Sequence, residues 1–294
     1  MNLVLIANCQ VQPYAAKFSA LSDIEKVVVV PIHLQGRPMF ESAKVEMMKL
    51  VESDADLRIL TFNLDDSRGE ISTSFLKERC EHVKTFTNIF FDGLQPDCTY
   101  LADIGKRVPS PIGDYHSKIV VHSFVKGLSV STCIDLFNLE TYRRVGYLDR
   151  YGESMTELRR RDEKLDIPLA DSLDSCFRKT HSLFTFNHPT SAVFSVTTSA
   201  LASAIGLNYP NAFSALEQNH LANSSWFPIF PEILDFHNCT YTGNYVFKPP
   251  TQAGGKFLSL EKFVTQSYEL YASNRSTLLQ AKQLSKILEM PVTE

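Results

Sequence analysis

The sequence predicts an α/β protein with an open, mostly parallel sheet flanked by helices and with additional helices toward the C-terminus. Two observations lead to this prediction. In the first hundred residues, short apolar runs alternate with amphipathic stretches, which is typical of a parallel sheet covered by helices. The 294 residues are 44% apolar, which suffices for a substantial core in one large domain or two small ones.

Each predicted strand is a short apolar run, and the stretch after it has helical spacing. A strand over residues 3–6 leads through Asn8-Cys9-Gln10 to a helix near Pro13, where the missing N–H costs nothing. In residues 39–53 apolar side chains recur at i, i+3, i+4 and i+7, which predicts a helix with one buried face. Residues 83–91 are rich in β-branched and aromatic residues and predict a strand. The same reasoning predicts strands over residues 27–32 and 57–62 and a helix over residues 73–82.

Beyond residue 92 the pattern is less regular. Residues 93–114 are rich in Gly, Pro and Asp and form a long connection, for which we expect a function. Thr190 is predicted to cap a helix over residues 191–205, which is closed by Gly206. Helices are also predicted over residues 129–137 and 142–161, from Asp166 onward and, as one or two helices, over residues 258–288, with a strand over residues 183–186.

Charge and composition exclude several classes of protein. The chain has 29 Lys and Arg against 33 Asp and Glu, so its net charge of -4 attracts neither nucleic acid nor an anionic membrane. The mixed-sign run over residues 157–163 is interpreted as a solvated helix face rather than a phosphate site. Because no targeting segment or run of 18 apolar residues is found, we expect a cytoplasmic protein without membrane insertion.

Cysteine and histidine spacing gives no sign of a metal or of disulfides. The six cysteines contain no C-x-x-C pair and are predicted to be free thiols in a reducing compartment. The eight histidines lack metal-ligand spacing, so we expect no metal. The chain also lacks H-E-x-x-H, G-x-S-x-G, Walker A and G-x-G-x-x-G motifs, which leaves metalloproteases, α/β-hydrolases and dinucleotide enzymes without support.

Cys9 lies where the first predicted strand gives way to the first helix, and open α/β sheets bind ligands at such ends. Backbone N–H groups at a helix N-terminus can lower the pKa of a thiol and can hold an oxyanion or a phosphate. The flanking amides of Asn8 and Gln10 can donate to a developing negative charge. The alternative is that Cys9 is a small buried hydrophobe.

His188 is the second candidate catalytic residue. Pro189 favours an extended conformation for it, between a strand and a helix, where a neutral imidazole can act as a general base. The alternative is a histidine that caps the next helix or packs in a loop. Residues 115–117, Tyr-His-Ser, form another polar cluster, which we expect to face a ligand. The alternative is that His116 is a surface residue.

Four short motifs follow one another along the chain. They are LIANCQ at residues 5–10, FFDGLQPD at residues 90–97, YHS at residues 115–117 and FNHPT at residues 186–190. With GLS at residues 127–129 and VGY at residues 145–147 they resemble the polysaccharide-biosynthesis enzyme WcbI family. We predict a catalytic domain with a flavodoxin- or SGNH-like core over residues 1–206. Residues 207–294 are predicted to be an extension of aromatic- and proline-rich sequence and helices that pack on the domain or on a second subunit.

The resemblance implies an acyltransferase that uses acetyl-coenzyme A (CoA) to acetylate a sugar of a bacterial capsule or related surface polysaccharide. It implies that Cys9 is the reactive cysteine and His188 its partner, although Ala7 stands where the family has glycine. Because CoA carries negatively charged phosphates, we also expect basic residues at the site. The predicted binding residues are Asn8, Gln10, Arg68, Tyr115, His116, Ser117, Lys118, Asn187 and Thr190. The alternatives are a cysteine-dependent esterase or thioesterase, and a non-catalytic module that binds CoA or a polysaccharide.

Overall fold

The computed structural model describes residues 1–103, 106–210 and 219–293, and the chain divides into two compact units. The first, here the sheet unit, comprises residues 1–90, 156–176 and 188–221. The second, here the aromatic unit, comprises residues 91–155, 177–187 and 222–294. Both units are therefore assembled from separate segments. The division into a catalytic domain over residues 1–206 and an extension over residues 207–294 stays a prediction.

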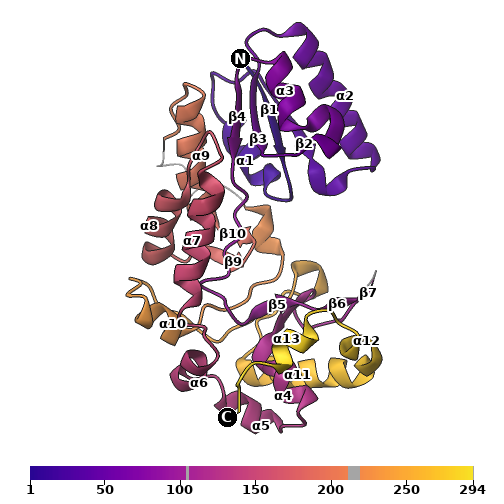
Figure 1. Ribbon diagram of the computed structural model, residues 1–294, viewed down its shortest axis with the longest axis vertical. Coiled ribbons are helices and arrows are strands. Elements are labelled where there is room, and N and C mark those ends of the chain that lie inside the picture. Colours follow the sequence, from indigo (N-terminus) through magenta and orange to yellow (C-terminus); the bar gives the residue numbers. More distant parts are fainter. Residues whose placement is uncertain (104–105, 211–218, 294) are drawn as a thin grey trace. The chain divides into compact units, whose positions relative to one another are not determined.

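A parallel sheet forms the centre of the sheet unit (Figure 1). Its strands are β1 (Asn2–Ala7), β2 (Lys26–Pro31), β3 (Arg58–Phe62) and β4 (Val83–Phe86), in the order β2-β1-β3-β4. Ile6 of β1 is in register with Val30 on one side and Thr61 on the other, so the carboxyl ends of the strands share one edge. The predicted α/β class is confirmed, and this order is found in flavodoxin-like sheets. An SGNH-like core stays a prediction.

Alternation along the strands divides the apolar side chains between the two faces of the sheet. One face packs against α2 (Pro38–Ser53) and α3 (Thr73–Arg79), which contribute Phe40, Met47 and Leu76 to a core with Val4, Ile6, Val28, Val30 and Ile59. Phe86 of β4 points to the opposite face, three residues after Val83 of that core. There it meets Tyr14 of α1 (Val11–Phe18), with ring centroids 5.5 Å apart.

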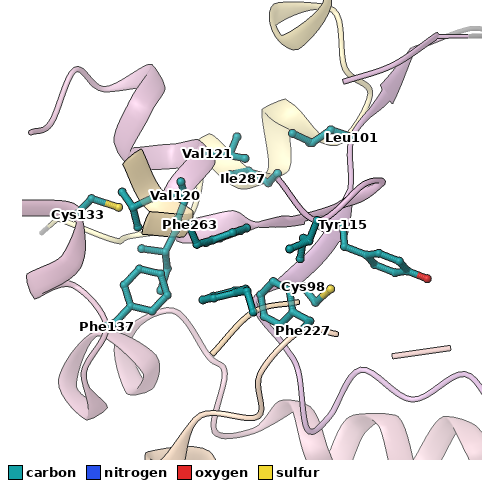
Figure 2. Packing of buried hydrophobic residues seen from close by; sticks show 14 of the residues in the cluster. Cys98, Leu101, Tyr115, Val120, Val121, Cys133, Phe137, Phe227, Phe263 and Ile287 are labelled. Atoms are coloured by element: carbon teal, nitrogen blue, oxygen red, sulfur yellow. The ribbon is translucent and has the colours of Figure 1, made fainter. Parts of the chain in front are cut away.

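The aromatic unit is built mainly of helices around a core rich in aromatic rings. Figure 2 shows Val120, Cys133, Phe227 and Phe263 among the packed side chains. Strands β5 (Cys98–Tyr100) and β8 (Tyr115–Ser117) pair antiparallel, as do β6 (Ala102–Asp103) and β7 (Lys106–Arg107). The helices are α4 (Lys118–Val125), α5 (Val130–Asp135), α6 (Leu139–Arg144), α10 (Pro231–Phe236), α11 (Leu260–Ser273), α12 (Arg275–Leu279) and α13 (Leu284–Leu288). Residues 177–187 contribute β9 (Leu183–Thr185).

Three predicted helices differ in the structure. The helix predicted over residues 142–161 is two, α6 and α7 (Arg150–Asp162), because Gly146 between them has φ 77°, in the left-handed region. The helix predicted from Asp166 begins later, as α8 (Ala170–Lys179), where Asp162 Oδ2 accepts the backbone N–H groups of Leu169 and Ala170 at 2.6 Å each. Residues 258–288 form three helices, not one or two.

Two further differences concern the ends of elements in the sheet unit. The strand predicted over residues 83–91 ends at Phe86, because the side chain of Gln10 rather than a neighbouring strand binds the backbone of Ile89. Helix α9 (Ser191–Ala204) begins after Thr190 as predicted. Thr190 is thus the N-cap residue as predicted, although its side chain makes no capping hydrogen bond to the backbone of α9.

Candidate functional site

The turn that carries Cys9 is closed by Asn8. Its side-chain Oδ1 accepts the backbone N–H of Gln10 at 3.0 Å, and its backbone carbonyl accepts the N–H of Val11 at 3.0 Å. An asparagine that binds the backbone two residues ahead makes a tight turn without secondary structure. Cys9 is therefore held at the carboxyl end of β1, two residues before α1 begins.

Gln10 connects this turn to the loop after β4. Its Nε2 donates to the Ile89 carbonyl at 2.7 Å, and its Oε1 accepts the Ile89 N–H at 3.0 Å. The Gln10 side chain is fully buried. The amide predicted to line the cleft thus holds together two loops at the same edge of the sheet.

The Cys9 thiol is partly buried, and burial raises its pKa from the ordinary value of 9.0. Its own backbone N–H opposes this change with a smaller effect. This direction is opposite to the lowering of the thiol pKa that a helix N-terminus predicts. At neutral pH the sulfur therefore carries its proton.

His188 is the first residue of the two-residue strand β10 (His188–Pro189) and lies three residues before α9 begins. Pro189 is fixed by Asn219, whose Nδ2 donates to the Pro189 carbonyl at 2.8 Å. Burial lowers the pKa of His188 from 6.5 to about 4. The imidazole is therefore neutral at physiological pH, and one of its two ring nitrogens carries no proton.

Helices α1 and α9 meet near their N-termini. Tyr14 and Phe194 are each the fourth residue of their helix, and their ring centroids are 4.9 Å apart in an edge-to-face contact. The Tyr14 hydroxyl also donates to Thr197 Oγ1 at 3.1 Å. The first turns of the two helices thus lie side by side within the sheet unit, with Cys9 just ahead of one and His188 just ahead of the other.

Tyr115 and Asn187 belong to a polar cluster in the aromatic unit. The Tyr115 hydroxyl donates to Asn187 Oδ1 at 2.8 Å, and Asn187 Nδ2 donates to the Tyr100 hydroxyl at 3.0 Å. The two tyrosine hydroxyls are 3.1 Å apart. Asn187, which precedes His188 in the chain, is thereby fixed in one orientation.

His116 is fully buried, so its interpretation as a surface residue is wrong. Its Nδ1 lies 2.8 Å from the Tyr271 hydroxyl and its Nε2 lies 3.1 Å from the Val108 carbonyl oxygen. Both ring nitrogens are therefore engaged inside the aromatic unit. Burial lowers the pKa of His116 to about 4, which keeps the ring neutral.

Ser117 and Lys118 support the start of α4. Ser117 Oγ accepts the backbone N–H of Val120 at 3.1 Å, and Lys118 Nζ donates to the Pro96 carbonyl. The buried carboxylate of Asp97 accepts the Ile119 N–H at 2.9 Å and the Tyr147 hydroxyl at 2.8 Å. Asp97 of the FFDGLQPD motif thus connects Tyr147 of the VGY motif with the first turn of α4, which follows the YHS motif.

Arg68 lies in a short 3-10 helix (Asp66–Ile71) of the loop that follows β3, in the sheet unit. It is exposed, and its guanidinium donates to Gln35 Oε1. The structure brings Asn8, Cys9, Gln10, Arg68, His188 and Thr190 into the sheet unit, and Tyr115, His116, Ser117, Lys118 and Asn187 into the aromatic unit.

Sequence reasoning missed a basic cavity in the sheet unit. Arg160, Arg161 and Lys164 line it at the carboxyl ends of β3 and β4. The signal was the charge run over residues 157–163, which was interpreted as a solvated face. Among the described residues, no group of three or more His, Cys, Asp or Glu side chains is placed to hold a metal ion. Nor does any helix in the described ranges have the length and apolar character needed to cross a membrane.

A family model over most of the chain shows the class of protein to which it belongs, the polysaccharide biosynthesis enzymes. The family model described as polysaccharide biosynthesis enzyme WcbI matches residues 2–210, and the chain is a member of this family. The family predicted from the motifs is thus confirmed.

A solved structure of WcbI has the same fold, with a TM-score of 0.68 and 18% sequence identity. The match covers 98% of this chain and 99% of the WcbI chain. That structure is described as a novel polysaccharide biosynthesis enzyme, as the native protein without a disulfide bond between CoA and one of its cysteines. No curated protein matches the chain.

Proposed function

We propose that the protein is a cytoplasmic, acyl-CoA-dependent O-acetyltransferase that acts on a sugar hydroxyl in bacterial capsular or surface polysaccharide biosynthesis. The observation that carries the proposal is the contact between Tyr14 and Phe194, which sets the start of α1 beside the start of α9. Cys9 and His188 precede these two helix starts. Membership of the WcbI family and the pairing of CoA with a cysteine in the description of the related structure support the choice of acyl donor.

In this proposal His188 acts as the general base. Because its pKa is about 4, the imidazole is unprotonated at neutral pH and can take the proton of a sugar hydroxyl. The hydroxyl oxygen attacks the thioester carbonyl, and a tetrahedral intermediate forms. Its collapse breaks the carbon–sulfur bond, and the departing CoA thiolate takes the proton back from His188. The products are an acetylated sugar and free CoA.

Cys9 has two conceivable roles in this chemistry. In one, His188 activates Cys9, whose thiolate takes the acetyl group and passes it to the sugar. In the other, the sugar attacks the bound thioester directly, and the Cys9 turn helps to shape the oxyanion site. Burial raises the pKa of Cys9 and lowers that of His188, so it works against a thiolate–imidazolium pair. This favours direct transfer.

The proposal is tested by incubating the protein with acetyl-CoA, with and without saccharide acceptors, and following CoA release and acetylated sugar by chromatography and mass spectrometry. The expected result is CoA release that depends on the acceptor and equals the acetylated sugar formed. Equal CoA release without an acceptor would instead indicate a thioesterase. Binding of CoA without release from acetyl-CoA under any condition would indicate a binding module.

A further inference from the structure

A cavity of about 380 Å³ lies at the carboxyl edge of the sheet, within the sheet unit. Its walls come from the ends of β3 and β4, the residues directly after them, and the end of α7. The described lining residues are Phe62, Asn63, Leu64, Phe86, Thr87, Asn88, Arg160, Arg161, Lys164 and Leu165. Small-molecule pockets usually measure roughly 300–1,000 Å³, and open α/β sheets place them at this edge.

The charge of the cavity is positive. Three of its described lining residues are basic and none of them is acidic. Glu157 binds Arg160 through two hydrogen bonds of 2.7 and 2.9 Å, but approaches Arg161 Nε only to 3.8 Å. The nearby carboxylate of Asp162 accepts two backbone N–H groups at the start of α8. No ion pair of Lys164 occurs among the residues that the structure describes. Positive charge is therefore left for a ligand.

The hydrogen bonds of the Arg161 guanidinium go to neutral acceptors. Its Nη1 donates to the carbonyl and to Oδ1 of Asn88 at 3.2 and 3.0 Å, and its Nη2 donates to the Phe90 carbonyl at 3.1 Å. Its Nε is buried and has no hydrogen-bond acceptor among the described residues. These three acceptors carry no charge, and among the described residues the one carboxylate that pairs with Arg161, Glu157 at 3.8 Å, is shared with Arg160, so the guanidinium is fixed in place while part of its charge stays uncompensated. A preorganised guanidinium of this kind suits a phosphate group.

The cavity shares a loop with the cysteine turn. The loop after β4 is bound at Ile89 by Gln10, and on either side of Ile89, at Asn88 and Phe90, by Arg161. Since β3 alone separates β1 from β4, the ends of β1 and β4 lie about 10 Å apart at the usual strand spacing. A ligand in the cavity is thus close to the turn that carries Cys9.

We propose that this cavity binds a phosphate group of a substrate, with Arg160, Arg161 and Lys164 as its cationic partners. The assignment to a substrate of acetyl transfer rests on the proposed function. Two kinds of substrate carry such a phosphate group. One is the acyl donor, through the phosphates of CoA, and the other is an acceptor sugar bound to a nucleoside diphosphate.

The test measures binding of four probes to the full chain by isothermal titration calorimetry. The probes are CoA, dephospho-CoA, adenosine 3′,5′-bisphosphate and a nucleoside-diphosphate sugar. The variants are Arg160→Gln and Lys164→Gln, both at exposed positions. The matched control is Arg159→Gln on the same helix, because Arg159 pairs with Asp171 at 3.3 Å and Asp174 at 3.6 Å and does not line the cavity. Circular dichroism confirms that each variant is folded.

We expect each cavity variant to weaken binding of at least one phosphorylated probe about tenfold, because one charge-assisted hydrogen bond contributes about this factor to the affinity. The Arg159→Gln control binds like the wild type. Dephospho-CoA lacks the 3′-phosphate of CoA. If the variants lose the preference for CoA over dephospho-CoA, the phosphate bound in the cavity is the 3′-phosphate of the donor. If only the nucleoside-diphosphate sugar is affected, the group belongs to the acceptor.

Equal affinities of wild type and cavity variants for every probe, or no binding by the wild type, overturns the assignment. Because binding needs no turnover, this result is separable from the proposed function. A wild type that binds as expected but transfers no acetyl group contradicts acetyl transfer and leaves the phosphate site standing.

Discussion

Gln10 and Ile89 bind each other twice, through hydrogen bonds of 2.7 and 3.0 Å between the Gln10 amide and the Ile89 backbone. The two residues are 79 positions apart, and both are buried. This pair fixes the turn of Cys9 to the loop that also forms a wall of the basic cavity.

Replacing Gln10 by Ala leaves the Ile89 N–H and carbonyl buried without their partner. Each unsatisfied backbone group costs roughly 1–3 kcal/mol, so for the two groups we expect the free energy of unfolding to fall by about 2–6 kcal/mol. Urea denaturation measures this change. Gln12→Ala, at an exposed position of α1, is the control and should change the stability by less than about 0.5 kcal/mol. Equal stabilities of the two variants would refute the structural role of Gln10.

Two glycines of the aromatic unit should respond in opposite directions to alanine. A Cβ on Gly93 would lie 2.7 Å from the backbone Cα of Tyr151, so Gly93→Ala should destabilise by about 1–3 kcal/mol through overpacking. A Cβ on Gly152, in α7, meets nothing within 4 Å, and Gly152→Ala should stabilise by roughly 0.5–1 kcal/mol. Thermal unfolding followed by circular dichroism compares the two, and a tolerated Gly93→Ala would contradict the close approach.

Lys17 gives a pH dependence of stability. Its Nζ donates to Ser195 Oγ at 3.1 Å and to the Tyr209 hydroxyl at 3.3 Å, and burial lowers its pKa from 10.5 to about 8. Between these two values the unfolded chain holds a proton that the folded protein has released. The contribution of Lys17 therefore makes the free energy of unfolding rise with pH through this window.

Urea denaturation at pH values below and above 8 checks this contribution. In Lys17→Met the rise should be smaller than in the wild type, whereas the exposed control Lys49→Met should keep it. An identical pH dependence in Lys17→Met and the wild type would show that Lys17 titrates normally.

Variants of Cys9 separate the two routes of acetyl transfer. Because burial raises the pKa of the thiol, we predict direct transfer, and Cys9→Ala should keep activity within about tenfold of the wild type. Intact-mass spectrometry after rapid mixing with acetyl-CoA should show no acetyl group on Cys9. Cys9→Ser is the matched control for side-chain size. An acetylated wild type together with an inactive Cys9→Ala would establish the covalent route instead.

The strands and helices of the sheet unit could be predicted because their signals are local. Strands such as β1 are short apolar runs, and α2 shows a helical period. The end of β4 could not be predicted, because it depends on Gln10, far away in the chain. The division into two units, each assembled from three segments, depends on contacts of the same kind.

The candidate site could be predicted only in part. The motifs predict Cys9 and His188 as site residues, and the structure bears out their positions just before helices. The place of Arg161 at the cavity could not be predicted, because mixed charges at helical spacing look alike whether they face water or a sheet edge. His116 was misread as a possible surface residue, since no local pattern reveals that Tyr271 lies beside it.

The most direct test of the central claim is the pH dependence of kcat/KM for acetyl transfer to an acceptor sugar, in the wild type and in His188→Ala. Since kcat/KM reports the free enzyme and the pKa of His188 is about 4, the wild-type value should be constant near neutrality and fall only as the pH approaches 4. His188→Ala should lose at least about 100-fold in rate and lack this fall, while still binding CoA. A wild-type profile that falls near pH 6.5, or a His188→Ala variant as active as the wild type, would contradict the assignment of His188 as the base.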